Sequence, residues 1–124
     1  MRELPQDSSA RSSTKRICWV LTLSPFQRDF TSFLEQLRKT LGDGHRVFVY
    51  CLDEGVRAGE ILVEEAKRWP GLRIAVCAYG ASRRRLPPQP GVLYAGLGTL
   101  AQWILSTEEC RADGGDAERG QQRV

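Results

Sequence analysis

Strand-length apolar runs alternate with segments of helical periodicity along the middle of the chain, and this alternation restricts the fold more than any other feature. Ile17–Leu23 is an almost continuous apolar run, which is typical of a strand buried on both faces. Apolar residues then recur at helical spacing from Phe26 to Leu41, and the glycines of Gly42-Asp-Gly44 end that helix. Strands joined by helices through short links predict a parallel sheet.

The same alternation continues through the rest of the chain. The predicted strands after the first are residues 46–51, 72–77 and 92–94, and the predicted helices are residues 56–69 and 99–107. We therefore predict one α/β domain over residues 16–110, with three layers: a mostly parallel sheet of four to five strands and helices on both of its faces. Residues 1–15 and 111–124 are polar and aperiodic, and they are predicted to be disordered tails.

Composition excludes several classes of protein. Of the 124 residues, 41% are hydrophobic and 27% are charged, as in ordinary soluble domains. The net charge of +3 is too small to predict direct nucleic-acid binding. The longest apolar run is too short to cross a bilayer, and the amino terminus lacks the apolar region of a signal peptide. We expect a cytoplasmic protein without membrane contact.

The chain has four cysteines, Cys18, Cys51, Cys77 and Cys110, which are widely spread and show no C-x-x-C spacing. A disulfide scaffold or a structural zinc site is therefore not expected. His45 is the only histidine, so neither a metal site nor a Ser/His/Asp relay can be assembled around it. Chemistry of an individual thiol, with no metal or organic cofactor, is the remaining candidate.

Cys77 is the best placed of these thiols. It ends the predicted strand 72–77, and the carboxyl ends of parallel strands border the crevice where open α/β sheets bind ligands. A small-residue turn and then Arg83, Arg84 and Arg85 follow it, so that amide and guanidinium groups would favour the thiolate. The alternative is a buried, inert cysteine followed by an exposed charged loop.

The other three thiols have different surroundings. Cys51 competes with Cys77 because it too ends a strand at this edge, although Asp53 and Glu54 in the adjoining turn would raise its pKa. Cys18 lies inside the first predicted strand and is expected to be buried. Cys110 is at the border of the predicted domain and is expected to be exposed without a role.

Gly96-Leu-Gly98 resembles half of a nucleotide-binding fingerprint. It lacks the third glycine and comes too late for a first βαβ unit, so a tight turn with close helix packing is the favoured interpretation. A nucleotide-binding regulator remains a third and weaker hypothesis for the whole chain.

Three segments in order resemble the DsrE/TusD-like (DsrE/DsrF-like) family of sulfur-relay proteins. They are residues 47–56 with the Asp53-Glu-Gly55 turn, residues 77–84 with Cys77 before the arginines, and residues 94–102 with Gly96-Leu-Gly98. The resemblance implies a sulfurtransferase in which Cys77 carries sulfane sulfur as a persulfide. It makes Arg83, Arg84, Asp53, Gly55, Gly96 and Gly98 candidates for binding or electrostatic support.

The resemblance also implies partners. These are sulfur donor and acceptor proteins, a TusA-like carrier among them, and a homo- or hetero-oligomer, expected as a trimer or hexamer. A non-catalytic assembly subunit of such an oligomer is the alternative function. Two features depart from the family pattern: Arg85 stands where the family has glycine, and residues 108–115 are too polar for the usual last strand. The sheet is therefore expected to end one strand short or to be completed by a partner.

Overall fold

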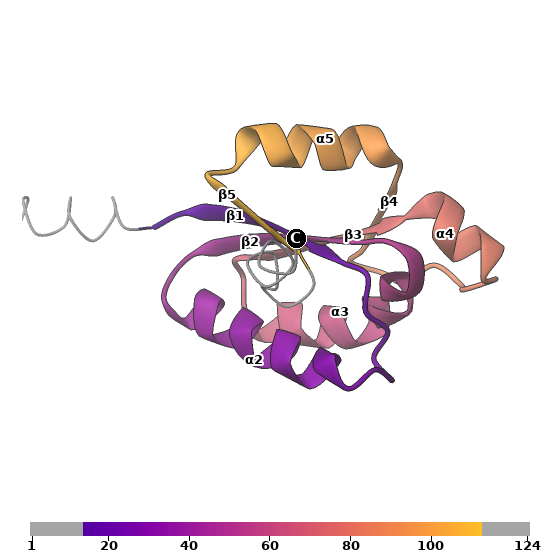
Figure 1. Cartoon of the computed structure of the whole chain (residues 1–124), viewed down its shortest axis with the longest axis horizontal. Coiled ribbons are helices and arrows are strands. Elements are labelled where there is room, and N and C mark those ends of the chain that lie inside the picture. The colour runs from indigo at the N-terminus through magenta and orange to yellow at the C-terminus, as the bar shows by residue number, and fades with distance from the viewer. Residues whose placement is uncertain (1–13, 113–124) are drawn as a thin grey trace, which may run out of the picture.

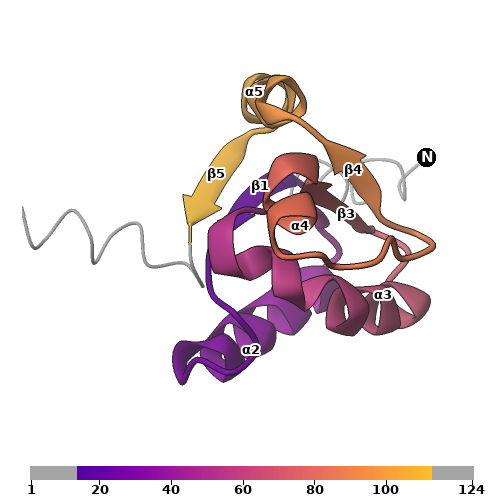
Figure 2. The same cartoon turned by 90° about the vertical axis from the view of Figure 1, so that its right-hand side faces the viewer.

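A five-stranded, entirely parallel sheet forms the middle layer of the molecule (Figures 1 and 2). The computed structural model describes residues 14–112. The strands of the sheet are β1 (Arg16–Leu21), β2 (Arg46–Cys51), β3 (Leu72–Cys77), β4 (Leu93–Ala95) and β5 (Glu109–Ala112). They lie in the order β4-β3-β2-β1-β5 across the sheet.

Helices cover both faces of this sheet, which confirms the predicted three layers. The helices α2 (Asp29–Gly42) and α3 (Gly59–Arg68) lie side by side on one face, and α5 (Leu97–Ser106) lies alone over the other (Figure 1). A 3-10 helix, η1 (Asp53–Ala58), leads into α3, and the short helix α4 (Ala78–Arg83) extends beyond the end of β3. No helix within residues 14–112 is long and apolar enough to cross a membrane.

The main core lies between the sheet and the layer of α2 and α3. Alternate residues of β1 point into it, and Ile17, Trp19 and Leu21 are completely buried. The ring of Phe33 on α2 packs edge-on against the Trp19 ring, with 5.5 Å between centroids. On the opposite face α5 has no buried residue, so the two helical layers differ greatly in how tightly they pack.

The prediction of a missing last strand is wrong. β5 pairs in parallel with β1 from Ile17↔Glu109 to Val20↔Ala112, although its sequence is polar. Its carboxylates are neutralised locally, since Glu109 forms ion pairs with Lys15 and Arg111. An edge strand that leaves its side chains partly exposed does not need an apolar run. The strand also extends the domain to Ala112, two residues into the predicted tail; residues 1–13 and 113–124 lie outside the described part of the chain.

The segment after Cys77 is also more regular than the sequence suggested. We expected a turn there, but residues 78–83 form the helix α4. The small side chains explain this: Gly80 approaches Val56 so closely that an added Cβ would lie 3.2 Å from its Cγ1. The helix can therefore pack directly against η1.

Candidate functional site

Cys77 lies where β3 passes into α4 at the carboxyl edge of the sheet. It is the N-cap residue of α4, and its Sγ accepts a hydrogen bond of 3.4 Å from the Gly80 backbone N–H. Caps of this kind are usually Ser, Thr, Asp or Asn, whose oxygen accepts the free amide. Here a sulfur takes that place, so an amide dipole points at the thiol, as the sequence predicted.

An open cavity of about 820 Å³ borders this thiol. Its walls come from three places that are distant in the sequence: the turn after β2, the helix α4 and the start of α5. The lining residues are Leu52, Asp53, Glu54, Arg57, Cys77, Tyr79, Gly80, Arg83, Arg84, Gly96 and Leu97. The structure thus brings Cys77 together with Asp53, Arg83, Arg84 and Gly96, four of the six residues that were expected to support it.

The two remaining glycines lie elsewhere. Gly55 is buried beneath the cavity, where an added Cβ would lie 2.1 Å from the Leu21 carbonyl oxygen, so it serves the close approach of η1 to β1. Gly98 is exposed on the first turn of α5, with open space around it. Neither glycine lines the cavity.

Tyr50 is a neighbour of Cys77 that sequence reasoning missed. Its side chain is completely buried, and its hydroxyl donates a hydrogen bond of 3.1 Å to the Ala95 carbonyl oxygen. Burial, together with the charge and hydrogen bond of the adjacent Cys77 thiol, raises the pKa of Tyr50 to about 12. The phenol therefore stays protonated at neutral pH beside the sulfur. A signal did exist: Tyr50 lies opposite Ala75 in the sheet, one side-chain pair away from Cys77 on the same face.

Arg84 is held in a network at the mouth of the cavity. Its Nε and Nη2 donate to Glu54 Oε2 at 3.1 and 3.0 Å, and its Nη1 donates to the Gly80 carbonyl oxygen. Arg57 Nε donates to the other oxygen of Glu54 at 2.8 Å. The hydrogen bonds from Arg57 and Arg84 lower the pKa of Glu54, so this carboxylate stays ionised. Arg84 thus links α4 to η1 and brings positive charge to the rim.

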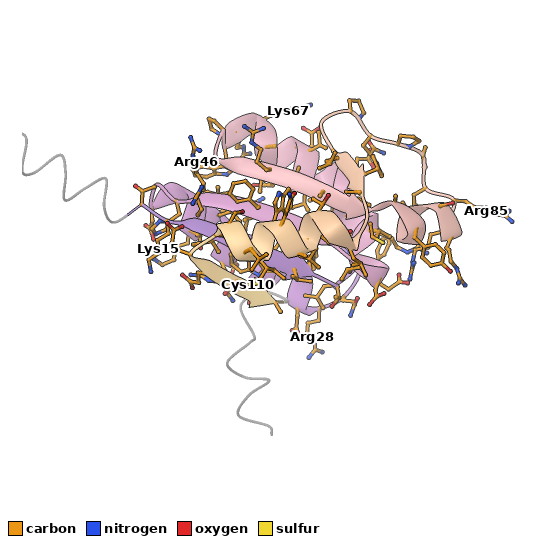
Figure 3. The ribbon with its side chains drawn as sticks, turned by 90° about the horizontal axis from the view of Figure 1, so that it is seen from above. Lys15, Arg28, Arg46, Lys67, Arg85 and Cys110 are labelled. Carbon is orange, nitrogen blue, oxygen red and sulfur yellow. The ribbon has the colours of Figure 1, made fainter. Side chains whose placement is uncertain are left out.

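Arg83 and Arg85 are arranged differently. Arg83 donates to the Tyr79 hydroxyl at 3.0 Å and lies over the Tyr79 ring, 5.6 Å from its centroid. Arg85 adopts a positive φ of 55° and points outward at the end of the molecule that carries α4 (Figure 3). Among the described residues its guanidinium has no hydrogen bond or ion pair. The arginine run therefore supplies one guanidinium to the network with Glu54, one to Tyr79 and one to the outer surface.

The other thiols are not equivalent to Cys77, which is partly exposed. Cys51 is completely buried, and this burial, rather than the nearby carboxylates, raises its pKa to about 12. Cys18 is completely buried as well; burial, reinforced by the adjacent Cys110, raises its pKa to about 12. Cys110 is exposed on β5, on the far side of the sheet from β4. Cys51 is therefore no rival in the folded state.

The chemistry that these groups allow is nucleophilic and thiol-based. A partly exposed sulfur faces an open cavity with an amide N–H on one side and a phenol on the other. The amide N–H can stabilise negative charge on sulfur as it stands, and the Tyr50 hydroxyl can do so by turning its single proton from the Ala95 carbonyl oxygen to the thiolate. Among residues 14–112 no group of three His, Cys, Asp or Glu side chains is arranged to hold a metal ion.

Comparisons with known proteins show the fold. No family model matches the sequence, and no curated protein matches it significantly. The structure is similar to the crystal structure of the YchN protein from E. coli, with a TM-score of 0.65 and 20% sequence identity. The match covers 80% of this chain and 99% of YchN. At this identity the likeness shows a shared fold.

Proposed function

We propose that this chain is a sulfur-transfer protein that carries sulfane sulfur as a persulfide on Cys77. One observation carries the proposal: Cys77 is the thiol that lines the cavity at the carboxyl edge of the sheet while its sulfur accepts an amide N–H. Cys18 and Cys51 are enclosed by the core, and Cys110 lies on a different edge of the sheet. Among the four cysteines, Cys77 is therefore the one that is both solvent-accessible and next to the cavity.

The transfer needs two displacement steps. The Cys77 thiolate attacks the outer sulfur of a donor persulfide, R–S–SH; the S–S bond of the donor breaks and the donor leaves as the thiolate R–S⁻. The product is Cys77–S–SH, whose ionised form the Gly80 N–H can stabilise and whose inner sulfur lies beside Tyr50. An acceptor thiolate then attacks the outer sulfur, and the Cys77 thiolate is regenerated. The chemistry requires no cofactor.

Two likenesses support this assignment. The fold is shared with YchN, and the three sequence segments that resemble the DsrE/TusD-like proteins meet around one cavity: residues 53 and 54, residues 77–84 and residues 96 and 97 all contribute to its lining. The parallel sheet brings these segments to one edge because each lies at the carboxyl end of a strand, and that edge is where open α/β sheets bind ligands. We propose that the chain belongs to this sulfur-relay family.

The partners follow from the site. We propose a protein donor and a protein acceptor, the latter of the TusA-like kind, since the cavity is open and its rim carries exposed charge. Arg83 lines the cavity, and Arg85 points outward at the end of the molecule that carries α4, so both would attract an acidic surface. Free thiols used in this way suit the reducing cytoplasm.

A second candidate function is a non-catalytic assembly subunit, and one observation favours it. The helix α5 carries no charged residue, and Leu97, Ile104 and Leu105 are 62%, 43% and 85% exposed. An apolar helix that buries none of its residues within its own chain is typical of an interface. Because Leu97 also lines the Cys77 cavity, assembly and sulfur transfer are compatible in one protein.

Intact-mass analysis after incubation with a protein or small-molecule persulfide donor tests the proposal. We expect the wild-type protein to gain one sulfur atom, Cys77→Ser to gain none, and Cys110→Ser, a matched control at the other exposed thiol, to behave like the wild type. The added mass should disappear on treatment with a small thiol. Absence of loading in the wild type, combined with obligate co-purification of a related subunit, would favour the assembly function.

A further inference from the structure

A second pair of sulfur atoms lies on the opposite edge of the sheet from β4, and the proposed sulfur transfer does not use it. Cys18 on β1 and Cys110 on β5 are direct partners in the parallel register of these two strands. Their side chains therefore project from the same face of the sheet, so that the two thiols are neighbours across the β1–β5 pair. Figure 3 shows Cys110 on β5, away from the end of the molecule that carries α4.

The geometry permits a covalent bond between the two sulfurs. Neighbouring strands are about 4.8 Å apart, which falls within the roughly 4.4–6.8 Å that separates the Cα atoms of disulfide-bonded cysteines. This spacing is below the roughly 5.5–6 Å that is most common between disulfide-bonded cysteines, so the bond would carry some strain and be more easily reduced than an unstrained one. Such a bond is suited to reversible formation.

Access to the two thiols is unequal. Cys110 is exposed on the edge strand, whereas Cys18 is completely buried in the interior of β1. A reagent can therefore reach Cys110 but not Cys18. This is the arrangement of an attacking thiol with a resolving thiol behind it.

From these observations we propose that Cys18 and Cys110 are a second sulfur site, which forms a reversible disulfide between β1 and β5 by exchange with a small-molecule disulfide. The Cys110 thiolate attacks one sulfur of R–S–S–R, and one R–S⁻ leaves. The Cys18 thiol then attacks the Cys110 sulfur of the mixed disulfide and displaces the second R–S⁻, which takes up the Cys18 proton. Two protein thiols are oxidised and one small disulfide is reduced to two thiols.

The proposed disulfide would affect β5 and the helix α5 that precedes it. β5 is a four-residue edge strand that follows α5, and α5 begins at the wall of the Cys77 cavity with Gly96 and Leu97. A covalent bond between Cys18 and Cys110 would fix β5, the strand that follows α5, to β1. It would also close a loop that contains most of the domain. The oxidised protein should therefore resist unfolding more than the reduced one. The inference does not rest on the proposed function of Cys77.

The test uses the full chain with oxidised glutathione, followed by peptide mapping under non-reducing conditions. We expect a cross-linked peptide pair containing Cys18 and Cys110, no added glutathione in the final product, and a rise in Tm of about 5 °C or more that dithiothreitol reverses. Cys77→Ser should give the same product. In Cys18→Ala, the reaction should stop at glutathione on Cys110, and Cys110→Ser should show neither the cross-link nor the rise in Tm.

Two results would overturn the proposal. One is stable glutathione on Cys110 in the wild type with Cys18 still reduced, which would show that the buried thiol does not resolve. The other is a disulfide joining Cys110 to Cys77 or Cys51, which would show a different pairing. Because Cys110→Ser changes only an exposed side chain, it serves as the folding control if Cys18→Ala is unstable.

Discussion

The direction in which a strand residue points separates the two thiols that end neighbouring strands. Cys51 is paired with Val76, and both point into the core between the sheet and α2 and α3. Cys77 is one residue further along β3, so it points to the opposite face, toward Tyr50 and the cavity. A shift of one residue in a strand thus distinguishes a partly exposed thiol from a buried one.

Alkylation rates should reveal this difference. In the folded protein at neutral pH, we expect iodoacetamide to modify Cys77 first and Cys110 next. Burial raises the pKa values of Cys18 and Cys51 from 9.0 to about 12, which reduces their thiolate fractions roughly a thousandfold even before access is considered. Mass spectrometry of tryptic peptides over time measures the four rates. Rapid labelling of Cys51 in protein that stays folded would contradict the assignment of the site.

Tyr50→Phe tests the phenol beside Cys77. The change leaves the Ala95 carbonyl without its donor, so we expect a loss of about 1 kcal/mol in the free energy of unfolding. It also removes the hydroxyl next to the sulfur, and persulfide loading of Cys77 should slow severalfold. Tyr94→Phe is the matched control, because its hydroxyl accepts from the Gln89 N–H and lies outside the cavity. Equal loading rates in the two variants would exclude a role for Tyr50.

At the scale of elements, the sequence pattern within a segment predicted its secondary structure, whereas features that depend on contacts between distant segments were missed. Continuous apolar runs identified β1, β2 and β3, because buried strands need such runs wherever they occur. β5 was missed because the charge of its one acidic residue, Glu109, is balanced by Arg111 and by Lys15, and Lys15 is distant in sequence. Tyr50 was missed for a related reason: its contact with Cys77 depends on how β2 and β3 pair, which periodicity cannot show.

One ion pair, Arg38–Glu65, links α2 to α3, and it gives a pH-dependent prediction. Arg38 donates to both oxygens of Glu65, at 3.0 and 2.6 Å, and lowers the pKa of that carboxyl. A lowered folded-state pKa contributes stability that is complete above about pH 4.5 and is lost as pH falls through the folded-state pKa. Because the Arg38 side chain is 45% exposed, solvent screens the pair, and we expect about 1 kcal/mol.

Urea denaturation of Glu65→Gln measures this contribution. We expect the variant to be less stable than the wild type at pH 7, and the difference to shrink as the pH falls through the lowered folded-state pKa of Glu65. Glu64→Gln is the control, since Glu64 pairs with Lys67 at 3.0 Å but both side chains are about two-thirds exposed. Its effect should be near zero at every pH. A pH-independent loss in Glu65→Gln would assign its role to packing rather than charge.

At the scale of the whole molecule, the two faces of the sheet differ in how completely they are buried. The face with α2 and α3 forms the core, while the face with α5 leaves apolar side chains at the surface. The carboxyl edge that carries Cys77 could be located from the sequence, because right-handed crossovers place all strand ends of a parallel sheet on one rim. The exposure of α5 could not, since an apolar helix is expected to be buried by its own chain.

The exposed helix α5 predicts that the protein self-associates. The reason is not an unfinished sheet, because β5 pairs with β1 at the edge that was expected to be open. A ten-residue helix with no buried residue is marginal in water unless a partner covers it. We expect an assembly, a trimer or hexamer, at micromolar concentration in light scattering. Leu105→Glu places a charge at an 85% exposed position of α5 and should shift the protein toward monomers. Phe26→Glu is the matched control, since Phe26 is 88% exposed just before α2, away from α5, and should leave the assembly intact. A wild-type protein that is monomeric at these concentrations would show that α5 is stable without a partner.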